Sequence, residues 1–417
     1  MDKNELLKFR ENAALYIAAL KALKLKITFV EDSMKNSNPQ NNPVKYVTAR
    51  IKDEKSVEKK LEKKGFTTID ELHDIVGARV ILSSKKDIEE FIKVISSSPI
   101  IKVIEHKDYM DDKKNSGYRG YHLILEIPLE YNSEVINIKV ELQLRTELQD
   151  SWSRIEHAVN YKNDDCEDKI ALNLKRLSDS NNLCEELMEE CRSYIRKNKQ
   201  SKTKMTKKEE DLYNKNIALY DSALKKLDSE LTLAIDDYNT INPNGFVFKT
   251  SRIKDCESVY NKLYRMGYEY TEDNINGHIR DAVGYRIVCS NNSEVLKIVD
   301  LIQSITSFRI TRVQDYISKP KESGYMGYHF NVAIPIKSRD VEREVIAEIQ
   351  IRTEAMDAFA TYEEEIVYNN DTCPASIKSR LKAIGENIAI NDVFMERIYQ
   401  DSMRKKNSKK LTLKNGE

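Results

Sequence analysis

A polar signature in the first half of the chain returns in the second half at a constant distance of 207 residues. The segment from Asp74 to Thr146 matches the segment from Asp281 to Thr353, and both keep Asp, Arg, Tyr, His and Glu in the same order. A core can be built from many different sets of apolar residues, so packing alone does not require two copies to share these polar residues. Their recurrence therefore indicates a retained polar site or a recent duplication. Either interpretation predicts two domains of one fold.

The repeat also defines the domain layout. A length of 417 residues suggests two or three domains, and the repeat favours two. Arg50–Ser56 matches Arg252–Ser258 at a distance of 202 residues. The change from 202 to 207 places additional residues between Lys262 and Asp281, where we expect a loop. We predict a first domain at residues 1–197, a basic linker at 198–208, a second domain at 209–403 and a basic tail at 404–417.

Residue patterns within each copy predict an α+β fold. Residues 136–145 alternate strictly, with Val140 and Leu142 on one face and Glu141 and Arg145 on the other. We therefore expect a sheet with one apolar face against helices and one polar face open to a ligand. The other elements predicted for the first copy are strands at 78–82 and 122–127 and helices at 86–96 and 169–197.

In each copy, a short helix is expected between the basic element, Arg50–Ser56 or Arg252–Ser258, and the polar signature that follows it. Ser56 has the position of an N-cap and Gly65 that of a C-terminal stop, and Ser258 and Gly267 repeat this spacing. In the second copy we predict a helix at 376–403 in the place of 169–197.

Charge and cysteine usage exclude several classes of protein. Lys plus Arg equals Asp plus Glu at 68 each, so no global field draws the chain to nucleic acid or membrane. We interpret the basic stretches 192–208 and 404–414 as a solvated linker and a frayed tail, with a nucleic-acid or ribosome contact as the alternative. The sequence has no run of about 18 apolar residues, no signal pattern and no CxxC spacing. These features predict a cytoplasmic protein with reduced thiols and no zinc site.

The polar face of the first copy gathers positive side chains with few acids. They are Arg50, Lys52, Lys60, Arg79, Lys107, Lys113 and Lys114. Such a set suits a polyphosphate. Asp74 at a strand start can hold Mg²⁺, Glu141 can orient or deprotonate an attacking hydroxyl, and Tyr118 on a glycine-containing loop can stack on a nucleobase. Together these residues predict nucleotide-dependent phosphoryl or pyrophosphoryl transfer.

Each residue taken alone also has a purely structural interpretation. Glu141 would be a solvated strand residue, Tyr118 part of a plain turn, and His122 a histidine at the edge of the core. Their joint recurrence in the second copy favours a site. The motif GxxxxGK followed by Ser or Thr is absent, which excludes a P-loop ATPase. His73 and Asp74 lack the further His and Asp ligands that a metal-dependent HD hydrolase needs.

Five motifs follow one another in the first copy. They are R-x-K-x3-S-x3-K from Arg50, D-I-x-G-x-R from Asp74, K-D-Y-x4-K-x-x-G-Y-x-x-x-H from Lys107, E-x-Q-x-R-T from Glu141 and W-x3-E-H-x3-Y-K from Trp152. In this order they resemble the RelA/SpoT family of alarmone synthetases, and the compact size resembles its small members. The resemblance implies two tandem copies of a nucleotidyltransferase-like domain, each a mixed β-sheet flanked by helices.

The family resemblance also implies an activity and a set of site residues. The enzyme would transfer the β,γ-pyrophosphate of ATP to the 3′-hydroxyl of GDP or GTP, making (p)ppGpp and releasing AMP. Catalysis and Mg²⁺ binding would fall to Asp74, Glu141, Asp281 and Glu348. The implied ATP-binding residues are Arg50, Lys52, Lys60, Arg79, Arg252, Lys254, Lys262 and Arg286. The implied acceptor-binding residues are Lys107, Lys114, Tyr118, His122, Lys321, Tyr325 and His329.

The second copy departs from the pattern at three positions. Gln314 stands in place of Lys107, Glu364 in place of His157, and Asn369 in place of Lys162. Each change removes potential positive charge near an anionic ligand. We therefore predict that copy 1 is the main active site, and that copy 2 binds ATP and Mg²⁺ but is slow or regulatory.

The sequence leaves two other functions open. A toxin-like pyrophosphotransferase would act on the tRNA 3′ end or on an adenosine nucleotide. The basic stretches favour tRNA, whereas Tyr118 and Lys107 favour guanosine. A non-catalytic nucleotide sensor is the second alternative, and the carboxylates retained in both copies argue against it. We expect ATP and GDP or GTP as partners, with tRNA as the alternative and no membrane partner. An oligomer is compatible with the sequence, and the tandem pair could form inside one chain the contact that single-domain relatives make between subunits.

Overall fold

The computed structural model describes residues 3–37, 43–99, 101–110, 113–160, 168–197, 206–241, 246–338, 341–368, 370 and 373–414. The chain divides into two compact units, Met1–Glu185 and Glu186–Glu417, each described by itself below. This division falls within helix α6 (Asp168–Lys197), upstream of the predicted linker, of which residues 198–205 lie outside the described part. The domain boundaries therefore stay a prediction. No helix in the described ranges is long and apolar enough to cross a membrane.

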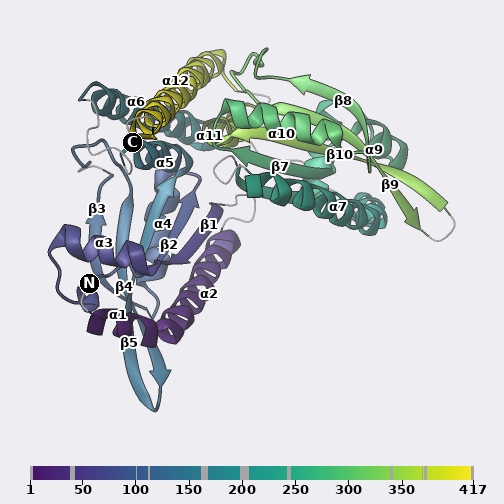
Figure 1. Ribbon diagram of the computed structural model, residues 1–417. Coiled ribbons are helices and arrows are strands. Elements are labelled where there is room, and N and C mark those ends of the chain that lie inside the picture. The colour runs from purple at the N-terminus through teal and green to yellow at the C-terminus, as the bar shows by residue number, and fades with distance from the viewer. Residues whose placement is uncertain are drawn as a thin grey trace. The chain divides into compact units, whose positions relative to one another are not determined.

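The first unit is built on a mixed five-stranded sheet with the order β1-β2-β5-β4-β3 (Figure 1). Its strands are β1 (Val44–Ile51), β2 (Val76–Leu82), β3 (Lys102–Asp108), β4 (Tyr121–Tyr131) and β5 (Glu134–Thr146). Only β2 and β5 run parallel; the β1–β2, β5–β4 and β4–β3 pairs are antiparallel. The predicted strands at 78–82, 122–127 and 136–145 are confirmed as the inner parts of β2, β4 and β5.

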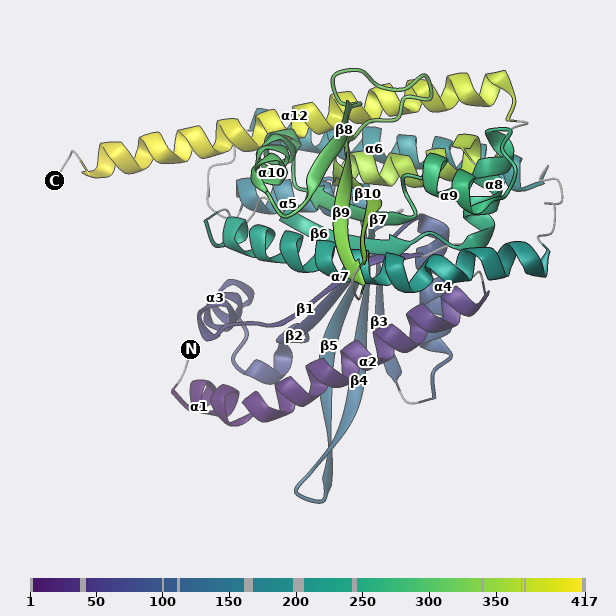
Figure 2. The ribbon, with the colours of Figure 1, turned by 90° about the vertical axis from the view of Figure 1, so that its right-hand side faces the viewer.

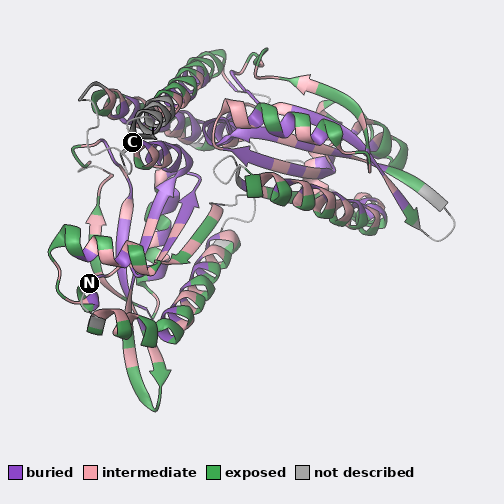
Figure 3. Cartoon of the chain, in the orientation of Figure 1, coloured by how far each residue is buried: buried purple, intermediate pink, exposed green. Residues whose placement is uncertain are grey.

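One face of this sheet carries the core. Helices α2 (Ala13–Ser37) and α4 (Lys85–Ser96) cover it, and α2 runs along the strands (Figure 2). Leu23 and Phe91 from these helices pack with Val80, Leu123 and Leu142 from the strands, all fully buried. Figure 3 shows the strands buried where the helices cover them and the β4–β5 hairpin exposed toward its tip. The alternation of β5 therefore predicted the core face correctly.

The remaining helices of this unit surround the polar face and its edges. They are α1 (Lys3–Glu11), α3 (Glu54–Lys64), the 3₁₀ turn η1 (Ile69–Glu71), α5 (Glu147–Asn160) and α6. Helix α3 ends as predicted at Gly65, whose φ of 67° is readily adopted by glycine. Its N-cap, however, is Asp53 rather than Ser56. The Asp53 carboxylate accepts hydrogen bonds from the Ser56 backbone N–H and hydroxyl, so Ser56 is the residue capped.

The second unit repeats this architecture with the sheet order β6-β7-β10-β9-β8. Its strands are β6 (Phe246–Ile253), β7 (Val283–Cys289), β8 (Arg309–Asp315), β9 (Tyr328–Ser338) and β10 (Val341–Thr353), and its principal core helices are α7 (Lys207–Ile241) and α10 (Asn292–Ser304). Leu227 and Ile298 from these helices pack with Val283, Phe330 and Ile349. The two units therefore share one α+β fold, as the repeat predicted.

Three local features distinguish the second unit. Helix α8 (Cys256–Arg265) is followed by α9 (Glu272–His278), so the additional residues form a helical turn rather than only a loop. Helix α11 (Glu354–Glu363) continues as a π-helical turn, η2 (Glu364–Tyr368). Helix α12 (Ala375–Lys414) contains the predicted helix at 376–403, and its backbone continues through most of the basic segment expected to be a frayed tail.

Candidate active site

Asp74 lies immediately before β2, between two lysines. The backbone N–H of Lys52 donates to the carbonyl of Ile75 at 2.8 Å, which joins the end of β1 to the start of β2. The ammonium groups of Lys52 and Lys60 then both contact Oδ2 of Asp74. The other oxygen, Oδ1, is buried and accepts no hydrogen bond within the described residues. Asp74 thus presents one unsatisfied oxygen among side chains predicted to bind ATP.

Glu141 lies in the middle of β5, next to β2 and β4. His122 Nδ1 is 3.2 Å from Oε1 of Glu141, and Gln143 Nε2 donates to Oε2 at 2.9 Å. Burial alone would raise the pKa of Glu141, but the hydrogen bonds from His122 and Gln143 and the charge of Lys60 outweigh it and lower the pKa to about 2. Glu141 is therefore an anion at neutral pH, and both of its oxygens are held.

Tyr118 and His122 are more buried than the predicted ligand-binding roles suggest, with 7% and 6% of each residue exposed. The Tyr118 hydroxyl lies 2.6 Å from Nε2 of His122. The Lys114 ammonium lies 4.6 Å from the centre of the Tyr118 ring, and the Arg145 guanidinium carbon lies 5.0 Å from it. A base that stacks on Tyr118 therefore has to displace Lys114.

Arg145 was expected on the open polar face, but it is 4% exposed. Its guanidinium donates from Nη1 to Oδ1 of Asp150 at 2.8 Å. Asp150, in the first turn of α5, is fully buried and also contacts Arg79 Nη1 at 3.0 Å and the Tyr46 hydroxyl at 2.6 Å. Burial would raise the pKa of Asp150, but the surrounding arginines lower it well below its usual range. The expectation failed because the alternation of a strand cannot show that a helix covers part of its polar face.

Asp150 is a residue that the sequence analysis missed. It joins Arg79, predicted to bind ATP, to Arg145, which contacts the acceptor-side Tyr118. The repeat does carry a signal for it, because Asp357 occupies the same place 207 residues later. Asp150 lies outside the polar strand and loop motifs, so it resembled an ordinary helix residue.

The remaining predicted residues of copy 1 lie on the same sheet or next to it. Arg50 is exposed on β1, opposite Gly77 of β2. Lys107 lies opposite His122 across the β3–β4 pair, and its ammonium is 3.2 Å from Glu105. The motif residues Tyr161 and Lys162 lie outside the described part of the chain.

The loop that carries Tyr118 is tied to helix α6. Ser178 donates to the carbonyl of Gly117 at 2.5 Å, and Asp179 pairs with both Lys113 and Arg119. Gly117 has a φ of 95°, and a Cβ there would lie 3.0 Å from the Cα of Lys175, so this close approach requires glycine.

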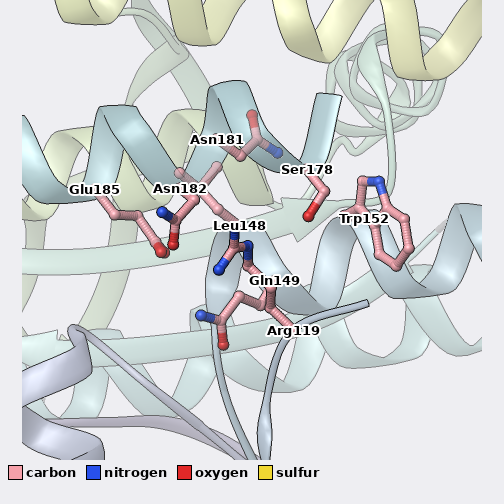
Figure 4. Close-up of a pocket in the computed structure, with 8 residues that line it drawn as sticks. All are labelled: Arg119, Leu148, Gln149, Trp152, Ser178, Asn181, Asn182 and Glu185. Atoms are coloured by element: carbon pink, nitrogen blue, oxygen red, sulfur yellow. The ribbon is translucent and has the colours of Figure 1, made fainter. Parts of the chain in front are cut away.

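A pocket lies between this loop, α5 and α6 (Figure 4). It is lined by Arg119, Leu148, Gln149, Trp152, Ser178, Asn181, Asn182 and Glu185. Its volume of about 10 Å³ is close to that needed for one water molecule. The pocket is therefore too small for a nucleotide.

The second copy reproduces the central contacts. Lys254 and Lys262 donate to Asp281 at 2.6 and 2.8 Å, one to each oxygen. His329 Nδ1 lies 3.2 Å from Glu348 Oε1, and Lys321 lies 4.4 Å from the centre of the Tyr325 ring. The structure therefore brings together equivalent predicted residues in both copies.

The second copy differs on the side predicted to bind ATP. Glu364 Oε1 lies 3.4 Å from Nη2 of Arg252. Burial would raise the pKa of Glu364, but Arg252, Arg286 and Lys254 lower it, so this carboxylate is an anion among the predicted ATP-binding cations. Gln314, in place of Lys107, donates to the Tyr316 hydroxyl. Asn369, the third departure, lies outside the described residues.

Comparison with known proteins matches both copies to one family model and also finds individual relatives. A family model described as a region found in RelA / SpoT proteins matches residues 49–166 and 251–372. GTP pyrophosphokinase YwaC of Bacillus subtilis is 38% identical over 177 residues, which are 42% of this chain and 84% of that protein. GTP pyrophosphokinase YjbM of the same organism is 30% identical over 183 residues, 43% of this chain and 86% of that protein. A crystal structure of small alarmone synthetase 1 from Bacillus subtilis, bound to its product pppGpp, is 29% identical, covers 45% of this chain and 98% of that chain, and has a TM-score of 0.43.

Proposed function

Because this chain belongs to the RelA/SpoT family, we propose that it is an ATP-dependent pyrophosphokinase that acts on GDP or GTP. The reaction transfers the β,γ-pyrophosphate of ATP to the 3′-hydroxyl of the acceptor, giving (p)ppGpp and AMP. The observation that carries the proposal is Glu141, an anionic carboxylate held at both oxygens, close to the cations Lys52 and Lys60 and next to the strand that carries Arg79. Two relatives that bear the name GTP pyrophosphokinase support it.

The ATP side is the group of cations around Asp74. Lys52 and Lys60 now contact Asp74, and Arg79 contacts Asp150. A bound triphosphate offers these cations several anionic oxygens, and such charge-assisted hydrogen bonds are among the strongest in proteins. Arg50, exposed on β1, is the proposed partner of the adenine ring.

Magnesium fits this arrangement. Within the described ranges no cluster of three or more His, Cys, Asp or Glu side chains could hold a metal, but Mg²⁺ commonly takes one or two carboxylates together with substrate phosphates. The buried, unsatisfied Oδ1 of Asp74 is a suitable ligand, and Glu141 is the proposed second one. When bound, the ion would neutralise charge on the phosphates.

The acceptor side comprises Tyr118, Lys114, Lys107 and His122. The Tyr118 ring supplies a platform for guanine once Lys114 leaves it for a phosphate. Glu141 then accepts the proton of the 3′-hydroxyl as that oxygen bonds to the β-phosphorus of ATP. The bond between the β-phosphorus and the α,β-bridging oxygen breaks, and AMP leaves with that oxygen. Glu348 has the corresponding role in copy 2.

The test is a product analysis with labelled ATP. The protein is incubated with ATP and Mg²⁺ together with GDP, GTP or tRNA, and the expected products are ppGpp or pppGpp and AMP. A variant with both Glu141→Gln and Glu348→Gln is the control and should give neither product. Transfer to tRNA alone would establish the toxin-like activity instead. Nucleotide binding without transfer to any acceptor would establish a sensor.

A further inference from the structure

Arg145 connects the buried Asp150 to both oxygens of Glu141. It donates from Nη1 to Asp150 at 2.8 Å, from Nε and Nη2 to the Tyr118 hydroxyl at 3.2 and 3.0 Å, and from Nη2 to Oε1 of Gln143 at 3.0 Å. A guanidinium can only donate hydrogen bonds. Tyr118 and Gln143 must therefore accept from Arg145. This fixes the direction of the next hydrogen bond that each of them makes.

The first branch passes through Tyr118 and His122. Since the Tyr118 oxygen accepts from Arg145, its own proton points to the remaining neighbour, Nε2 of His122, at 2.6 Å. Nε2 must then be the acceptor nitrogen, and a neutral imidazole carries its proton on Nδ1. That N–H donates to Oε1 of Glu141 at 3.2 Å.

The second branch passes through Gln143. Its side-chain oxygen accepts from Arg145, which fixes the orientation of the amide. The amide nitrogen then points to Oε2 of Glu141 and donates at 2.9 Å. One guanidinium therefore determines the donor at each of the two carboxylate oxygens.

We propose that Arg145 is a positioning residue that aims Glu141 at the acceptor hydroxyl by fixing the Nδ1–H tautomer of His122 and the amide orientation of Gln143. In this arrangement the Tyr118 ring and the Tyr118 hydroxyl have separate tasks, since the ring faces the acceptor base and the hydroxyl sets the tautomer. The role of Glu141 rests on the proposed function, whereas the tautomer of His122 does not.

Copy 2 contains the same two branches. Arg352 donates to the Tyr325 hydroxyl at 3.1 and 2.6 Å, and this hydroxyl lies 2.5 Å from Nε2 of His329. Arg352 also donates to Gln350 at 2.7 Å, and Gln350 donates to Glu348 at 2.6 Å.

The surroundings of the two arginines differ. Tyr46, which donates to Asp150, is replaced by Phe248 in copy 2, and Arg154, 3.4 Å from Asp150, is replaced by Thr361. The branches persist although their surroundings changed. The two branches therefore do not depend on one particular packing around the arginine. What they have in common is the carboxylate at which they end.

The first test reads the tautomer directly. In protein with ¹⁵N-labelled histidine, two-bond ¹⁵N–¹H correlations show which ring nitrogen carries the proton, and His122→Asn identifies the signal among the six histidines. We expect an Nδ1–H tautomer at His122 near neutral pH, and an increased Nε2–H population in Tyr118→Phe. An Nε2–H tautomer in the unmodified protein would overturn the proposal. The tautomer is read in the unmodified protein without substrate, and His122→Asn serves to assign the signal.

The second test separates the Tyr118 hydroxyl from its ring. In a background with Asp281→Gly and Glu348→Gln, Tyr118→Phe should lower kcat about tenfold and change the acceptor KM less than twofold. His122→Asn, which keeps an amide donor near the position of Nδ1, should retain more kcat than His122→Gln. Unchanged kcat in Tyr118→Phe, or equal losses in the two His122 variants, would contradict the proposal. Failure of the background protein to transfer pyrophosphate, when the unmodified protein does so, would count against copy 1 as the main active site. Failure of the unmodified protein would count against the proposed function, and both results leave the tautomer measurement valid.

Discussion

Copies 1 and 2 differ on the side predicted to bind ATP although they hold the proposed catalytic carboxylate in the same way. His157 of copy 1 corresponds to Glu364 of copy 2, and Glu364 pairs with Arg252. Burial lowers the pKa of His157, so copy 1 has a neutral ring where copy 2 has an anion. The contacts around Glu141 and Glu348, in contrast, agree atom for atom. The difference teaches that the hydrogen bonds around the carboxylate have been kept, whereas one position near the residues predicted to bind ATP carries a neutral ring in one copy and a negative charge in the other.

The loops that carry Tyr118 and Tyr325 diverge as well. In copy 1 the pairs of Asp179 with Lys113 and Arg119 tie the loop to α6. The corresponding loop positions of copy 2 are Pro320 and Met326, and Gly385 takes the place of Ser178. Copy 2 keeps a carboxylate, Glu386, in the place of Asp179 but lacks the cations and the serine of this tie, which adds to the reasons to expect lower activity from it.

The largest effect should come from removing the carboxylates of one copy at a time. Asp74→Gly with Glu141→Gln should lower total turnover by roughly 10²-fold or more, because a general base and a proposed metal ligand are lost. Asp281→Gly with Glu348→Gln should lower it by less than half. Initial rates of AMP formation check this comparison. It is reversed if the copy 2 variant loses most of the turnover and the copy 1 variant does not.

A second prediction compares the two buried aspartates. Asp150→Asn should destabilise the first unit by about 3 kcal/mol, because it leaves buried guanidinium groups without their counter-charge. Asp357→Asn should cost the second unit less, because Phe248 and Thr361 stand where Tyr46 and Arg154 face Asp150. Urea unfolding, followed with a fluorescent probe in each unit, measures both changes. Equal losses of unfolding free energy in the two units would show that Tyr46 and Arg154 do not change the cost of removing the buried carboxylate.

The third prediction concerns pH. Burial and nearby Glu396 raise the pKa of Asp392 to about 7, and Thr353, which donates to Asp392, opposes this only in part. The folded state then binds a proton that the unfolded state releases above its ordinary pKa of about 4. The free energy of unfolding of the second unit should therefore fall by up to about 2 kcal/mol between pH 5 and pH 7. Asp392→Asn should remove this dependence, and an unchanged slope in that variant would contradict the assignment.

A smaller effect is expected from exchanging His157 and Glu364, which lie on the side predicted to bind ATP. In protein with a disabled copy 1, Glu364→His should lower the KM for ATP roughly three- to tenfold, because an anion leaves the group of cations and solvent screens part of the gain. Glu364 is 40% exposed, which sets the lower end of this range. In protein with a disabled copy 2, His157→Glu should raise the KM for ATP. If both exchanges leave KM unchanged, this position does not distinguish the copies.

The smallest effect should come from the loop tie. Arg119→Met, the residue found in copy 2, removes one partner of the half-exposed Asp179. Such ion pairs contribute about 0–1 kcal/mol, so the acceptor KM of copy 1 should rise no more than about fivefold. Steady-state kinetics with varied GDP measures the change, and Arg176→Met on the same helix α6 is a control for the loss of a charge. A fall in KM would show that the tie opposes acceptor binding.

The sequence predicted the elements of the fold well because they depend on local patterns. The alternation in β5 and the glycine at the end of α3 are signals that neighbouring residues carry. Arg145 and Asp150 could not be assigned in this way, because their burial results from α5 packing on the polar face of the sheet. For the same reason the sequence placed Tyr118 on an accessible loop and could not show that Lys114 covers its ring.

The position of Lys114 over Tyr118 has a thermodynamic consequence. In the proposed binding mode, guanine stacks on Tyr118 after the ammonium leaves the ring, which sacrifices a cation–π contact of about 0.5–2 kcal/mol. A phosphate on the same ligand offers that ammonium a stronger partner. Base and phosphate are thereby coupled, so that guanosine should bind far more weakly than its missing phosphate contacts alone would suggest. On the proposed function, one lysine would make the site select for the whole nucleotide rather than for the base or the phosphate alone.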